Sequence, residues 1–128
     1  MNGGIFINGL IFKMGSQSAR VKGKNITLPV SPMIVNKRAM IPVRLAGEAL
    51  GLDVKWDSKN RMLAVSRESV SAVLKLNSPF MVKSPGGWVD LGVGPALKGG
   101  ILFVPANFFK EMGFNVRWDS KLKTIEIF

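Results

Sequence analysis

The sequence predicts an α+β fold of two repeated units, each a small antiparallel β-sheet curled around one short α-helix. First, IPVRLAGEALGLDVKWDSK (41–59) is nearly repeated by VPANFFKEMGFNVRWDSK (104–121). Second, apolar residues recur at helical spacing early in each of these stretches and at every second position elsewhere. Third, an apolar fraction of 47% in 128 residues is sufficient for a globular core.

The internal repeat extends over nearly the whole chain, which identifies the unit of the fold. Placing Gly51 on Gly113 aligns the two Trp-Asp-Ser-Lys runs at an offset of 62 residues. Further upstream, ITLPVSP falls on VDLGVGP at an offset of 63. We therefore predict two units that form one compact body. The units span residues 10–67 and 73–128, and the connection between them spans residues 68–72.

Strand patterns precede each helix. The apolar run at residues 3–12 predicts a strand, because it is too short for a membrane span and lacks the features of a signal peptide. Downstream, Arg20, Lys22 and Lys24 alternate with smaller or apolar residues, which predicts one strand with three basic side chains on one face at intervals of about 6–7 Å. Lys37 and Arg38 follow in a predicted turn.

A short helix follows in each unit. Pro42 suits the first helical turn, where a missing N–H costs nothing, and Gly51 suits the left-handed position after the last turn. Pro105 and Gly113 are the counterparts in the second unit. Because each helix has only about two turns, we expect tertiary packing to hold it in place.

A hairpin follows each helix. Trp56 and Trp118 are predicted to be the large inward-facing residues of the first strand, and Asp57 and Asp119 to start the turn. We expect Arg44, near the start of the first helix, to pair with a carboxylate such as that of Asp57.

Trp88 follows the turn SPGGW. We expect its ring to pack against the sheet, since tryptophan is largely buried in most proteins. The alternative is an exposed ring that stacks on a sugar or a base.

The chain has no Cys, no His and no Tyr, which excludes several functional classes. Disulfides, thiolate metal sites and Cys nucleophiles are ruled out, and a Ser, Thr or Lys nucleophile would lack a His base. The acidic residues do not have calcium-loop spacing. We interpret Glu48 and Glu111 as surface charges on the helices. The sequence therefore predicts no catalytic residue, no metal and no cofactor.

Eighteen basic residues against eight acidic ones give a net charge of +10. Residues 1–66 carry +7 and residues 67–128 carry +3, so the first unit is the better candidate for contact with a polyanion. The alternative is a solvated charged face that discourages edge-to-edge aggregation. The candidate polyanion-binding residues are Arg20, Lys22, Lys24, Lys37 and Arg38.

The chain resembles the copper amine oxidase N-terminal ("stalk") domain family. The resemblance is carried by GSQSARVKGKNITL (15–28), NKRAMIPVRLAGEALGLDVKWDSK (36–59) and VPANFFKEMGFNVRWDSK (104–121). Lys37 stands where the family often has Gly, and the second unit lacks the Arg that follows Val-Pro in the first. The residues that we assign to the structural signature are Pro42, Arg44, Gly51, Trp56, Asp57, Pro105, Gly113, Trp118 and Asp119.

The resemblance implies antiparallel strands twisted around a helix and an extracellular or envelope location in Gram-positive-type bacteria. It does not imply amine oxidation, which needs a Tyr-derived quinone and a His cluster for copper. We therefore expect a non-catalytic structural or adhesion module of a secreted or cell-surface protein, with its signal peptide absent from this chain.

The expected partner is an anionic cell-wall polymer or glycan, with self-association through exposed strands as a further expectation and no membrane span. A basic nucleic-acid-binding protein is one alternative, disfavoured because the chain shows no recognition helix and no RNA-binding signature. A hydrolase with an unrecognised carboxylate site is a weaker alternative.

Overall fold

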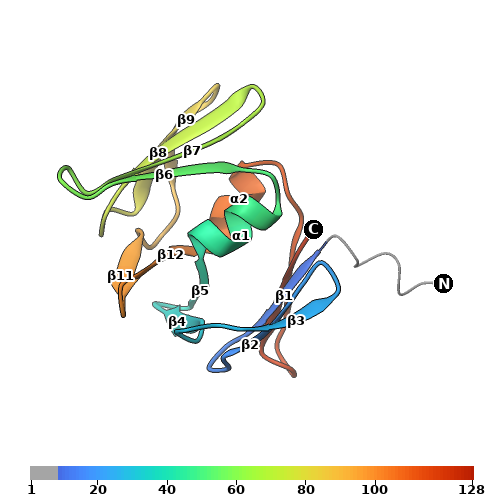
Figure 1. Cartoon of the computed structure of the whole chain (residues 1–128). Coiled ribbons are helices and arrows are strands. Elements are labelled where there is room, and N and C mark those ends of the chain that lie inside the picture. Colours follow the sequence, from blue (N-terminus) through green and yellow to red (C-terminus); the bar gives the residue numbers. More distant parts are fainter. Residues whose placement is uncertain (1–8) are drawn as a thin grey trace.

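The computed structural model describes residues 9–128 and contains three antiparallel sheets and two short helices (Figure 1). The helices lie between two five-stranded sheets, here called sheet A and sheet C (Figure 1). A four-stranded sheet, sheet B, leads into both helices. The α+β class predicted from the sequence is confirmed.

Each sheet has a simple antiparallel order. In sheet A the strands are β13 (Val116–Asp119), β14 (Thr124–Ile127), β1 (Leu10–Lys13), β2 (Ser18–Val21) and β3 (Lys24–Thr27). In sheet B they are β11 (Ala96–Lys98), β12 (Ile101–Pro105), β5 (Arg38–Pro42) and β4 (Met33–Val35). In sheet C they are β10 (Gly87–Asp90), β9 (Phe80–Ser84), β8 (Val70–Lys75), β7 (Met62–Arg67) and β6 (Asp53–Asp57).

Neither five-stranded sheet belongs to one repeat, which differs from the predicted sheet per unit. Sheet C joins β6 and β7 of the first repeat to β8–β10 of the second, and sheet A joins β13 and β14 of the second repeat to β1–β3 of the first. The predicted connection, residues 68–72, consists of a turn at Glu68 and Ser69 followed by the start of β8. Such a short turn makes the β7–β8 pairing local, which keeps its loop-closure entropy small.

Sheet B relates the two repeats by a pseudo-two-fold axis. Strands β5 and β12 pair with Ile41 opposite Val104 and Met40 opposite Pro105. The repeat offset of 63 residues converts Ile41 into Val104, so this pair maps onto itself and marks the axis. Both strands run directly into a helix, which brings α1 (Val43–Ala49) and α2 (Asn107–Glu111) to the middle of the molecule.

The glycines that end the helices are placed as predicted from the sequence, but the prolines are not in the first helical turns: Pro42 and Pro105 are the last residues of β5 and β12. Pro42 ends β5 and immediately precedes α1 with φ −65°, a value that suits a helix start. Gly51 and Gly113 follow the two helices with φ +84° and +96°, in the left-handed region that favours glycine.

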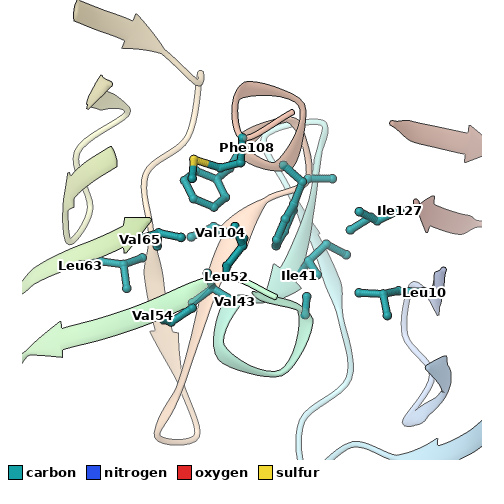
Figure 2. Close-up of a cluster of buried hydrophobic side chains, with 14 of the residues drawn as sticks. Leu10, Ile41, Val43, Leu52, Val54, Leu63, Val65, Val104, Phe108 and Ile127 are labelled. Carbon is teal, nitrogen blue, oxygen red and sulfur yellow. The ribbon is translucent and has the colours of Figure 1, made fainter. Parts of the chain in front are cut away.

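One core connects sheet A to sheet C (Figure 2). Figure 2 shows Leu63 and Val65 of sheet C on one side, Leu10 and Ile127 of sheet A on the other, and Phe108 of α2 between them. All five side chains are buried. The predicted strand over residues 3–12 is seen as β1 where the structure describes it, and residues 1–8 lie outside the described part. No helix within residues 9–128 has the length and apolar character needed to cross a membrane.

Candidate functional site

The basic residues of the first repeat do not form the predicted ladder. Lys22 and Gly23, with φ +51° and +80°, form a turn between β2 and β3, so the chain reverses where a continuous strand was expected. The register places Lys24 opposite Val21, on the sheet face that Arg20 does not share. The prediction that Arg20, Lys22 and Lys24 project from one face is therefore wrong, although all three are exposed.

Lys37 and Arg38 lie on sheet B, away from that hairpin. Lys37 occupies the β4–β5 turn with φ +65°, as predicted, whereas Arg38 is already the first residue of β5. The Arg38 guanidinium rests against Gly92, where a Cβ atom would come within 2.7 Å of Nε. Neither basic group has a carboxylate oxygen within 4.0 Å among residues 9–128, so both charges are uncompensated.

These two residues line an open cavity of 410 Å³, which we call the Trp118 groove. Trp118 of β13 forms part of its wall and is 41% exposed, so this ring is less buried than predicted. The groove thus combines two cationic groups with an accessible aromatic ring. Its lining also includes Ile34, Ala39, Ala106, Asn107 and Ile125.

Asn107 adds an unsatisfied acceptor to the Trp118 groove. Its Nδ2 donates to the carbonyl oxygen of Leu91 at 3.2 Å, which fixes the amide orientation. Its Oδ1 is buried and accepts no hydrogen bond from any described residue. A buried acceptor without a donor is costly, so a donor group on a ligand or a water molecule would be stabilised there.

The pseudo-two-fold axis produces a second cavity, of 430 Å³, which we call the Trp56 groove. Arg44 stands there at the position that corresponds to Asn107. Its Nη1 lies 3.3 Å from Glu48 Oε2 and donates to the carbonyl oxygen of Val54 at 3.3 Å. Arg44 thus pairs with a carboxylate, as expected, but this carboxylate belongs to Glu48, one helical turn away, and not to Asp57.

The two grooves differ at the hairpin tip that closes each of them. Gly100 and Ile101 of the β11–β12 hairpin line the Trp56 groove, whereas Lys37 and Arg38 of the β4–β5 hairpin occupy the corresponding positions in the Trp118 groove. The Trp56 groove is consequently lined mainly by apolar side chains, and its one guanidinium is already paired. Uncompensated positive charge is thus a property of the Trp118 groove.

The repeated aspartates are turn residues, as predicted. Asp57 Oδ1 accepts hydrogen bonds from the backbone N–H groups of Lys59 and Asn60 at 3.0 and 3.2 Å, and Oδ2 accepts one from Asn60 Nδ2 at 2.8 Å. These bonds, that from the Asn60 side chain first, lower the pKa of Asp57 below its ordinary value. Asp119 Oδ1 accepts from the N–H groups two and three residues ahead in the same way.

The helix carboxylates also have partners. Glu48 pairs with Arg44, and Glu111 Oε1 lies 2.9 Å from Lys83 Nζ. Within the part of the chain that the structure describes, no three acidic side chains gather in a group that could hold a metal ion.

Comparison with known families agrees with this architecture. The model of the copper amine oxidase N-terminal domain matches residues 8–65 and residues 20–127. The chain belongs to this family. Such a domain alone is non-catalytic and is often found in bacterial surface proteins, and a chain of 128 residues contains no amine oxidase catalytic domain. The comparisons found no match among curated proteins and none among solved structures.

In this copper amine oxidase N-terminal domain, the environment of Trp88 is the opposite of the predicted one. Trp88 is 76% exposed on β10, so the prediction that it packs against the sheet is wrong. Its neighbour Val89 faces the core instead, because successive residues of a strand face opposite sides.

Proposed function

We propose that this domain is a non-catalytic contact module of a bacterial secreted or cell-surface protein, acting outside the cell or in its envelope. Its partner is an anionic cell-wall polymer, which it holds in the Trp118 groove. The observation that carries the proposal is the pairing of uncompensated Lys37 and Arg38 with Trp118 around one open cavity.

The chemistry of this groove suits a phosphate- or carboxylate-bearing polymer. Arg38 offers a planar donor fork that matches such groups, and Lys37 adds a compact charge beside it. The Trp118 ring provides an apolar surface for the uncharged parts of the polymer. The net charge of +10 attracts any polyanion to the surface before it reaches the groove.

Asn107 favours a polymer that also carries hydroxyl groups. Because Oδ1 is buried, a hydroxyl would donate to it after a small movement of the side chains around it, with the Nδ2 bond to Leu91 kept intact. Phosphate alone has no such donor in its fully ionised form. The groove therefore favours a polyol- or sugar-phosphate over a simple anion.

The proposal is tested by sedimentation of the protein with intact Gram-positive cell walls at low and high salt. We expect a double variant, Lys37→Ala with Arg38→Ala, to lower the binding constant about tenfold or more, since each hydrogen bond to a charged group contributes about 1.5–3 kcal/mol. The matched control, Arg20→Ala with Lys22→Ala, removes two positive charges from the β2–β3 hairpin of sheet A. We expect it to weaken binding only by lowering the long-range electrostatic attraction between the protein and the polymer.

Equal losses in the two double variants would contradict the groove as the contact. Absence of wall binding at low salt would overturn the proposal as a whole. Duplex DNA is included as a competitor: if it displaces the protein from walls at equal phosphate concentration, the positive surface is a general polyanion site, and the nucleic-acid alternative is favoured.

A further inference from the structure

Sheet C has one face turned towards the helices and an outer face turned away from them (Figure 1). The outer face carries an exposed apolar track. Trp88, Val82, Val73 and Ala64 lie directly opposite one another on β10, β9, β8 and β7, so they form one row across the sheet. Their exposed fractions include 76% for Trp88, 39% for Val82 and 41% for Val73.

Sheet A provides an internal comparison, because the repeat places an equivalent row there. Asn25, Arg20, Ile11 and Glu126 occupy the positions that correspond to Trp88, Val82, Val73 and Ala64. The row on sheet A is mostly polar, although sheet A and sheet C have the same fold. The apolar character of the sheet C track is therefore not required by the fold, and it points to an interaction.

The track has polar groups along both borders, without interruption on one side and alternating with apolar side chains on the other. Ser84, Ser71 and Ser66 form the next row on one side, paired across β9, β8 and β7. On the other side, Asp90 lies opposite Phe80, which is 48% exposed, and Lys75 lies opposite Met62. The track thus has an apolar centre with hydrogen-bonding groups along both edges.

We propose that this face binds an uncharged polysaccharide chain, with a sugar ring stacked on Trp88. A pyranose chain has apolar C–H faces and hydroxyl groups along its edges, which match the apolar centre and the polar borders of the track. The outer face of sheet C carries three aspartates and two lysines, a net charge of −1, although the net charge of the whole chain is +10. This face therefore does not select an anion.

A second copy of this chain fits the face less well. Five strands at about 4.8 Å spacing and about 17 Å of strand length give a footprint of roughly 400 Å², whereas a stable interface buries about 800 Å² per partner. An extended chain of a few sugar rings needs only such a strip. The track and the Trp118 groove lie on different sheets, so this inference does not rest on the proposed function.

The test uses cell-wall sacculi stripped of phosphate polymers with hydrofluoric acid, in 0.5 M salt, where attraction between charges is screened. We expect the protein to sediment with them, and Trp88→Asn to lower the binding constant roughly tenfold or more, the range for losing one stacked ring. Asn is the residue that the equivalent position of sheet A carries, so the fold accommodates it. Asn25→Ala, at that equivalent position, is the matched control and is expected to bind as the wild type does.

Two results would overturn the proposal: no sedimentation with stripped sacculi, or equal binding by the Trp88→Asn variant. Sedimentation velocity without sacculi decides the remaining case. A wild-type dimer that Trp88→Asn converts to a monomer would show that a second copy covers the face, and this too would overturn it.

Discussion

Ile41 and Val104 face each other across strands β5 and β12, and both side chains are fully buried. Because the repeat converts one residue into the other, this contact lies on the pseudo-two-fold axis of the domain. Each of the two strands continues into the helix that forms the wall of one groove. The Ile41–Val104 pair therefore lies at the centre of the core, midway between the two halves of the domain and their grooves.

Truncation at this axis is expected to destabilise the whole domain. Ile41→Ala should lower the free energy of unfolding by about 2–5 kcal/mol, because it leaves a cavity that the surrounding strands fill only partly. Ile34→Ala serves as the control: this side chain is 51% exposed, so its loss should cost about 0.5 kcal/mol or less. Urea unfolding measures both, and equal effects would contradict a core centred on the axis.

The shared sheets predict that a circular permutant folds. Strands β1 and β14 pair with Leu10 opposite Ile127, so Phe128 can be joined to Met1 with residues 1–8 as the linker. New termini between Glu68 and Ser69 open a turn and leave every strand intact. Circular dichroism should show the same folded spectrum. A permutant opened between Ala64 and Val65, inside β7, should fail to fold; the reverse pattern would contradict the topology.

The β4–β5 turn offers a stabilising substitution. Lys37 has φ +65°, a conformation that costs a residue with a Cβ atom about 1–2 kcal/mol and costs glycine little. We expect Lys37→Gly, which creates an Asn-Gly turn, to raise the free energy of unfolding by about 1 kcal/mol. Lys37→Ala removes the same charge but keeps the Cβ atom. If it stabilises the domain equally, relief of charge repulsion and not backbone strain is the cause.

The Asp57 turn predicts a pH dependence of stability. Hydrogen bonds from Asn60 and Lys59 lower the pKa of Asp57 below its ordinary value of 3.8, so the carboxylate stabilises the folded state above that pH. This contribution is lost as the pH falls through the lowered pKa. We therefore expect wild type to melt at a higher temperature than Asp57→Ala at pH 6, and the gap to narrow as the pH falls below 3.8 and through the lowered pKa. A gap that stays constant from pH 6 to pH 2 would contradict the account.

The sequence was sufficient to predict the C-terminal ends of the helices and the turn aspartates. Gly51, Gly113, Asp57 and Asp119 have conformations or hydrogen bonds that depend on near neighbours along the chain, and local patterns report these well. The pairing between repeats is different. The β6–β7 hairpin has one apolar face that would suit either five-stranded sheet, so periodicity alone does not say which one it joins.

Two predictions that were wrong, the continuous basic strand and the packing of Trp88 against the sheet, could have been corrected from patterns in the sequence. Apolar positions change from odd to even numbers between Val21 and Ile26, and a continuous strand does not permit this change, so a turn must intervene at Lys22 and Gly23. The repeat alignment places Val89 on Ile26, so Trp88 falls on exposed Asn25. By contrast, the meeting of Arg38 with Trp118 joins residues from different repeats through tertiary packing, and no local pattern predicts it.

Amide NMR spectra during titration with a short glycerol-phosphate oligomer would show whether the Trp118 groove is the contact for an anionic polymer. We expect the largest shifts at residues 36–39 and at the Trp118 indole, and we expect the Lys37→Ala and Arg38→Ala double variant to lose them. Shifts confined to residues 20–24, or no saturable shifts at low salt, would contradict it.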